Sequence, residues 1–254
     1  MPNMWRTSDL PGGGGVLCVS GAGTEIGKTV TTAAVAACAL RAGRSVAVLK
    51  PAQTGVAADE PGDVAEVLRL AGGGGAVPDA MTGAELARYP EPLAPETAAR
   101  RADLPYVSAH QVAEAAEKLA ASHDLVLVEG AGGLLVRFDD DGSTLADAAR
   151  LLAAPVLVVV QAGLGTLNTA TLTAEALRAR RVECAGTVIG SMPATPGLAE
   201  RCNLADLPRY SGLPLLGAVP EGAGALPPAR FSAAAPGWLT PELGGTATVP
   251  AAAG

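Results

Sequence analysis

The stretch Ser20–Val30, SGAGTEIGKTV, lies between a short apolar run and a helix-forming segment, and it decides the fold. Its second half, Gly27-Lys28-Thr29, matches the end of the phosphate-binding loop G-x-x-x-x-G-K-[ST]. In such a loop the backbone N–H groups surround phosphate oxygens, the lysine reaches the terminal phosphates and the hydroxyl binds Mg²⁺. Ala22 replaces the first glycine of the pattern and still lets the backbone approach a phosphate. The alternative is a glycine turn that merely joins a strand to a helix, and the spacing of the lysine and threonine disfavours it.

Short apolar runs alternate with helical segments along the rest of the chain. The apolar runs are continuous stretches of Val, Leu and Ala, which is typical of strands buried on both faces. Strands are expected at residues 16–20, 45–50, 124–130, 154–161, 184–190 and 214–219, and helices at 28–41, 63–70, 108–122 and 168–180. This alternation predicts an α/β fold of the P-loop NTPase type, with a doubly wound, mostly parallel sheet and helices on both faces.

The length of 254 residues suits one such domain, which we place at residues 16–225. Residues 1–15 are expected to form a flexible leader without the features of a signal peptide. Residues 226–254, rich in Ala, Pro and Gly, are expected to be irregular.

Composition excludes several classes of partner. A net charge of −7 argues against nucleic-acid or anionic-membrane surfaces, and 3% aromatic residues leave few platforms for stacking bases. No apolar run is long enough to span a bilayer. The four cysteines form no C-x-x-C pair, which favours reduced thiols and a cytoplasmic location. The chain has only two histidines, which disfavours catalysis by a histidine.

Three further segments are expected to end at the same sheet edge as the phosphate loop. LKPAQTG places Lys50 and Thr54 there, LVEGAGG places Glu129 there, and LGTLNT (Leu164–Thr169) leads into a helix. Taken singly, each could be a solvated strand end or ordinary helix capping. Together with Lys28 they predict a pocket for anions. No nucleophile lies beside a base in the sequence pattern, so the substrate is expected to bring its own nucleophile.

The order of these motifs resembles that of the dethiobiotin synthetases. The resemblance spans about Val16 to Val219 and rests on GAGTEIGKT, KPAQTG, RYPEPLAPETAA, LVEGAGGLLV and LGTLNTATLT. In that family one amine of 7,8-diaminononanoate takes up CO₂ as a carbamate, which attacks the γ-phosphate of ATP. The second amine then displaces phosphate and closes a cyclic urea. The resemblance implies ATP and Mg²⁺ as cofactors, diaminononanoate and CO₂ or bicarbonate as substrates, and a homodimer with the substrate site at its interface.

The resemblance also implies roles for individual residues. Lys28, Lys50 and Thr54 would be catalytic, and Thr29, Asp63 and Glu129 would hold Mg²⁺ directly or through water. The nucleotide would contact Gly23, Thr24, Glu25, Ile26, Gly27, Lys28, Thr29, Val30, Gly190 and Pro220. The substrate would contact Thr24, Lys50, Thr54, Gly132 and Gly133, and, from the second subunit, Leu164, Gly165, Thr166, Leu167 and Asn168. Tyr89–Pro95 would wall the substrate pocket.

Three positions depart from the family pattern. Many relatives have Asp at Gly23 of the loop and Pro at Arg137. Where the family commonly has an Asn that reads the adenine edge, this chain has Gly190, which offers only backbone. We therefore expect ATP to be used, with other nucleoside triphosphates accepted as well.

Two other interpretations of the same motifs remain open. A related P-loop ATPase could act as a nucleotide-dependent regulatory binding module, either of the chromosome-partitioning type or as a scaffold without catalysis. The partitioning type needs a lysine five residues before Lys28, a position that Gly23 occupies here. A cobyrinic-acid amidase type would need a glutaminase cysteine, for which the sequence offers no site.

Overall fold

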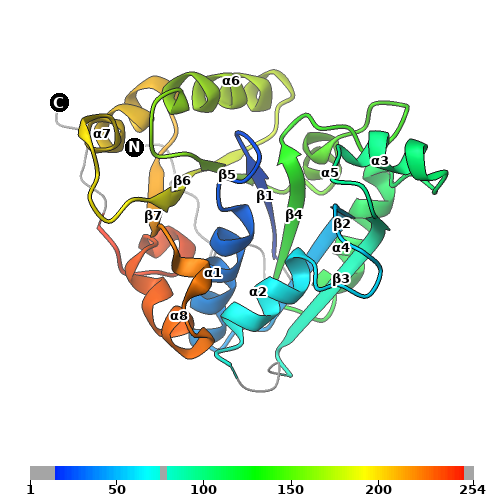
Figure 1. Ribbon diagram of the computed structural model, residues 1–254, viewed down its shortest axis with the longest axis horizontal. Coiled ribbons are helices and arrows are strands. Elements are labelled where there is room, and N and C mark those ends of the chain that lie inside the picture. The colour runs from blue at the N-terminus through cyan, green and yellow to red at the C-terminus, as the bar shows by residue number, and fades with distance from the viewer. Residues whose placement is uncertain (1–14, 75–78, 249–254) are drawn as a thin grey trace.

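The computed structural model describes residues 15–74 and 79–248, and a seven-stranded sheet forms its centre. The strand order is β3-β2-β4-β1-β5-β6-β7, and each paired strand is parallel to its neighbours (Figure 1). The strands are β1 (Gly15–Gly21), β2 (Val46–Thr54), β3 (Met81–Tyr89), β4 (Leu125–Gly133), β5 (Val156–Val160), β6 (Cys184–Met192) and β7 (Leu215–Pro220). This arrangement confirms the predicted doubly wound α/β fold, with the switch in strand order beside β1.

Helices cover both faces of the sheet. They are α1 (Lys28–Arg41), α2 (Asp63–Ala71), α3 (Pro95–Ala102), α4 (Ala109–Ala120), α5 (Leu145–Leu151), α6 (Thr166–Ala179), α7 (Leu198–Ser211) and α8 (Pro228–Ala234). The first apolar cluster joins the sheet to α1, α2 and α8, and the second joins it to α4, α5, α6 and α7 (Figure 1). Within β4, Leu127 belongs to the first cluster and Val128 to the second, which explains why the strands are apolar without interruption. None of the helices in the described residues has the length and apolar character needed to cross a membrane.

Strand β3 and the helices α3, α5 and α7 were not predicted from the sequence. β3 pairs with β2 and forms the edge of the sheet, and much of it is exposed, so its sequence MTGAELARY lacks an apolar run. Helix α5 did carry a signal: Thr144 and Asp147 form a capping box at its start.

The expectation of an irregular end after Leu226 is wrong for Pro228–Leu243. Helix α8 and the two short 3₁₀ turns after it pack against α1 and α2. Phe231, Leu239 and Leu243 are buried, and the Phe231 ring meets Trp238 edge to face with centroids 5.1 Å apart. A few bulky residues spaced among Ala, Pro and Gly are enough to anchor the segment on the core, and the average composition does not reveal them. The predicted leader falls largely on residues 1–14, which, like residues 249–254, lie outside the described residues, and Gly15 already belongs to β1.

The packing of α8 gives a test of stability. Replacing Phe231, which is 0% exposed, by Ala should lower the free energy of unfolding by about 3 kcal/mol, because the change removes a buried ring and leaves a cavity. The matched control is Leu198→Ala, which truncates a side chain that is 73% exposed and should change that free energy by less than about 0.5 kcal/mol. Urea unfolding followed by circular dichroism measures both. Equal effects would contradict the packing of the C-terminal segment on the core.

Candidate active site

The phosphate loop connects β1 to the start of α1. Gly27 is the N-cap of α1 and has φ 87°, a left-handed conformation that favours glycine. The helix has no side-chain cap and no acidic residue in its first turn, so its first N–H groups are available to an anion. Lys28 Nζ donates a hydrogen bond to the carbonyl oxygen of Gly23 at 3.2 Å. Burial, followed by repulsion from Lys50, lowers the pKa of Lys28.

Lys50 and Glu129 lie side by side because of the strand register. Leu49 of β2 pairs with Val128 of β4, and the next residue on each strand is the charged one. Lys50 Nζ is 3.0 Å from Glu129 Oε1, and it also donates to the Gly130 carbonyl at 3.1 Å. The side chain of Lys50 is 4% exposed and that of Glu129 is 1% exposed, so the pair is inside the protein.

A second carboxylate joins this pair from the start of α2. Asp63 Oδ2 lies 2.5 Å from Lys50 Nζ. Burial lowers the pKa of Lys50, but attraction to Glu129 and Asp63 outweighs it and raises that pKa above its ordinary value. Lys50 is therefore a firmly charged ammonium group at the edge of the sheet.

Thr29, Asp63 and Glu129 supply oxygen atoms of the kind that Mg²⁺ prefers as ligands. Thr29 Oγ1 donates to Glu129 Oε1 at 2.9 Å, while Glu129 Oε2 is buried without a hydrogen-bond partner. Within residues 15–74 and 79–248, no group of three or more His, Cys, Asp and Glu could hold a metal. Two carboxylates and a hydroxyl are a set of hard oxygen donors that suits Mg²⁺, which usually keeps water and phosphate oxygens as its other ligands.

A cavity of about 710 Å³ collects most of the residues expected at the site. Both lysines line it, as do Thr54, Asp63 and Gly132. Its complete lining is Thr24, Glu25, Ile26, Gly27, Lys28, Thr29, Val30, Lys50, Gln53, Thr54, Gly55, Asp63, Pro92, Leu93, Ala94, Pro95, Ala131, Gly132 and Val136. Gln53 and Val136 were not singled out from the sequence, although Gln53 stands inside the KPAQTG motif.

The expected walling loop and several expected contacts are placed differently. Pro92–Pro95 line the cavity, but Tyr89 is buried, 1% exposed, lines the second cavity described below, and donates to the Pro105 carbonyl at 2.7 Å. The lining lacks six groups of residues that were expected to contact ligands or the metal: Gly23, Glu129, Gly133, Gly190, Pro220 and Leu164–Asn168.

Residues Leu164–Asn168 lie after β5, where α6 begins. Gly165 is the N-cap of α6, and this helix start also lacks a side-chain cap and an acidic residue. Asn203 of α7 holds the preceding turn by donating to the carbonyls of Ala162 at 2.7 Å and Gly163 at 3.1 Å. Leu164 is 84% exposed, so this corner presents an apolar side chain to the exterior of its own chain.

Gly190 of β6 packs directly against the phosphate loop. A Cβ atom built on Gly190 would collide with the carbonyl of Ile26, and one built on Gly27 would collide with the carbonyl of Gly190. Pro220 of β7 pairs with Met192 just beyond. The glycine at 190 therefore permits a close approach of two backbones.

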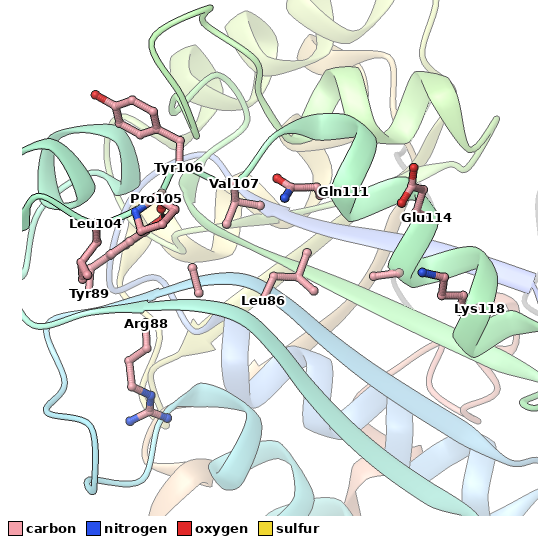
Figure 2. A pocket seen from close by; sticks show the side chains of 12 residues that line it. Leu86, Arg88, Tyr89, Leu104, Pro105, Tyr106, Val107, Gln111, Glu114 and Lys118 are labelled. Carbon is pink, nitrogen blue, oxygen red and sulfur yellow. Dashed lines mark hydrogen bonds between the residues drawn. The ribbon is translucent and has the colours of Figure 1, made fainter.

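A second cavity, of about 500 Å³, lies between β3 and α4 (Figure 2). Leu86, Val107 and Gln111 line it, and Lys28, Lys50 and the carboxylates around them do not. Figure 2 shows Arg88 on the opposite side of β3 from Gln111, and Arg88 Nη2 is 2.9 Å from a carboxylate oxygen of Glu85. The chemistry expected from the sequence belongs to the first cavity.

Comparisons with known proteins identify the family of the chain. The chain matches the AAA domain family over residues 16–228. It is 70% identical to "ATP-dependent dethiobiotin synthetase BioD" of Streptomyces avermitilis, over 91% of this chain and 94% of that protein, and 59% identical to the protein of the same name in Rhodococcus jostii, over 88% and 94%. A ParA family ATPase from Chlorobium tepidum has a similar fold, with a TM-score of 0.55 at 12% identity over 91% of this chain and 96% of that one. The likeness to the ParA family ATPase shows the fold alone, whereas the two identities show that the chain belongs to the family of ATP-dependent dethiobiotin synthetases.

Proposed function

We propose that the chain catalyses the ATP-dependent carboxylation and ring closure of 7,8-diaminononanoate, which yields the cyclic urea of dethiobiotin. The observation that carries the proposal is the convergence of Lys28 and Lys50 on one cavity at the phosphate loop, in a chain 70% identical to a dethiobiotin synthetase. A carbamate and a triphosphate are both anionic, so their reaction needs positive charge where they meet.

The residues of the cavity suit each step of this chemistry. One substrate amine and CO₂ form a carbamate with loss of a proton, and Lys50 holds the new anion beside the loop. A carbamate oxygen attacks the γ-phosphorus and ADP leaves, while Lys28 and the N–H groups of α1 stabilise the transferred phosphoryl group. The second amine then attacks the carbonyl carbon, phosphate leaves, and a proton is lost as the ring closes. Thr54 donates a hydrogen bond to the carbamate or phosphoryl oxygen, and positioning carries most of the acceleration.

We assign Thr29, Asp63 and Glu129 as the residues that would hold Mg²⁺, because Thr29 contacts Glu129 beside the phosphate loop and Lys50 contacts both carboxylates. The unpartnered Glu129 Oε2 supports the assignment. A bound Mg²⁺ supplies positive charge to the β- and γ-phosphates.

We further propose a homodimer in which α6 of one subunit completes the substrate site of the other. In a single chain Leu164–Asn168 are absent from the cavity lining, although α6 begins with uncapped N–H groups that suit the substrate's carboxylate. Exposed Leu164 and Leu172, which is 57% exposed, supply apolar surface for the contact. A cytoplasmic location completes the proposal and is supported by four unpaired cysteines.

Replacing Lys50 by Ala should lower the rate of cyclic urea formation by about 10³-fold, because the carbamate loses the charge that holds it. Purified protein is incubated with diaminononanoate, bicarbonate, Mg²⁺ and ATP, and the product is quantified by mass spectrometry. Lys118→Ala, which removes a lysine of the second cavity, is the matched control and should keep wild-type activity. Absence of the cyclic urea with wild-type protein would refute the function, and full activity of Lys50→Ala would refute the mechanism.

Nucleotide selectivity is expected to be loose, since Gly190 offers no side chain to the base. The turnover rates with ATP, CTP and GTP at equal concentrations should agree within about tenfold. One or two hydrogen bonds from a side chain to the base would give a larger preference for one nucleotide. Activity with ATP alone would contradict this expectation.

The shared site can be tested by mixing two inactive variants. Asn168→Asp places a negative charge at the start of α6 and should repel the substrate's carboxylate, while Lys50→Ala disables the other half of the site. Subunits mixed at random should regain about a quarter of wild-type activity, since half of the dimers are mixed and each mixed dimer has one intact site. No recovery after confirmed subunit exchange would show that each chain builds its own site.

A further inference from the structure

Gln53 makes a hydrogen bond that crosses from the sheet to the start of α2. Its Oε1 accepts the backbone N–H of Asp63 at 2.8 Å, and its Nε2 donates to the Thr54 carbonyl at 3.2 Å. Gln53 is 4% exposed, so both ends of the amide are fixed in a largely buried position. Neither the mechanism above nor the expected site residues give this side chain a role.

The start of α2 depends on this bond because its own N-cap cannot supply one. Gly62 is the N-cap, and no side chain caps the helix from that position. A Cβ at Gly62 would lie 2.7 Å from Gln53 Oε1 and 2.9 Å from Glu85 Oε1, so the glycine leaves the space that the glutamine occupies. The cap of α2 therefore comes from β2, ten residues earlier in the chain.

The bond falls on the residue whose carboxylate faces Lys50. Asp63 is half-buried and follows a largely exposed connection, residues 55–62, while Lys50 stands three residues before Gln53 on β2. Arg88 of β3 anchors the middle of the connection by donating to the carbonyls of Ala57 at 2.8 Å and Glu60 at 2.6 Å. Gln53 anchors its end, so one strand carries both the lysine and the group that fixes the carboxylate opposite it.

We propose that Gln53 is a positioning residue that holds Asp63 in place for the divalent cation and for Lys50. The expected effect of Gln53 on cation binding rests on the proposed function. Its expected effect on the Asp63 backbone amide rests on the hydrogen bond alone. A carboxylate delivered by an exposed connection is displaced easily, and a displacement of about 1 Å is enough to impair a preorganised site.

Gln53→Met keeps the length of the side chain and removes the strong acceptor, while Gln53→Glu keeps the acceptor. In the full-length protein without ligands, hydrogen exchange at the Asp63 amide, followed by NMR, should be about tenfold faster in Gln53→Met, as expected for the loss of one hydrogen bond. Gln53→Glu should keep the wild-type rate. A glutamine that only touched the substrate would leave this amide unchanged in both variants, so an unchanged rate in Gln53→Met overturns the proposal.

The second measurement is Mn²⁺ affinity by electron paramagnetic resonance, in the presence of a non-hydrolysable ATP analogue. The dissociation constant should rise about tenfold in Gln53→Met, in line with the loss expected when a support of a metal ligand is removed. Ser211→Ala is the matched control, because it removes a buried side-chain acceptor from the Leu213 amide at 3.2 Å, at the far end of α7. Ser211→Ala should leave both the Mn²⁺ affinity and the exchange rate of the Asp63 amide unchanged. If Ser211→Ala changed them as much as Gln53→Met does, the proposal would be overturned. Failure of wild-type protein to bind Mn²⁺ with the nucleotide would count against the proposed function instead and leave the amide result standing.

Discussion

Lys50 and Glu129 form an ion pair between neighbouring parallel strands, and the rest of the site is arranged around it. Glu129 pairs in register with Val19 of β1, the strand that leads into the phosphate loop, and stands beside Lys50 of β2. Removing both charges from water costs several kcal/mol per ion by general estimates, and a well-packed apolar pair would often be as stable. Burial of this pair at a ligand cavity is therefore better explained by the chemistry it permits than by stability.

The same strand register explains why the site draws on residues far apart in the sequence. Parallel strands point their carboxyl ends to one edge, so the segments after β1, β2 and β4 meet although about a hundred residues separate Thr29 from Glu129. Helix α1 adds the positive end of its dipole at that edge. A low local dielectric then strengthens each of these charges toward an anionic reactant.

The elements that the sequence predicted are those with a strong local signal. Buried parallel strands are long apolar runs, and Gly27-Lys28-Thr29 has a fixed spacing between a strand and a helix, so both were readable. Strand β3 was not, because this edge strand is exposed or half-buried from Thr82 to Arg88 and carries Glu85 and Arg88, so it has no apolar run. The C-terminal segment was missed because its stability comes from Phe231 and Leu239 meeting α1 and α2, a tertiary effect that composition does not reveal. The role of Gln53 was not predicted for the same reason, since its partner is a backbone amide ten residues away.

Gly190 shows how packing can account for a departure from a family pattern. Compared with the family pattern, Gly190 stands where an Asn side chain would contact the base. In the fold, the β6 backbone at this point lies so close to Ile26 and Gly27 that a Cβ would collide with the loop. Any side chain there would have to push the phosphate loop away from β6, and the loop carries Lys28 and the start of α1. In this chain, the close approach of β6 to the loop leaves no room for a side chain at position 190, so an Asn that reads the base there would need a different packing of β6 against the loop.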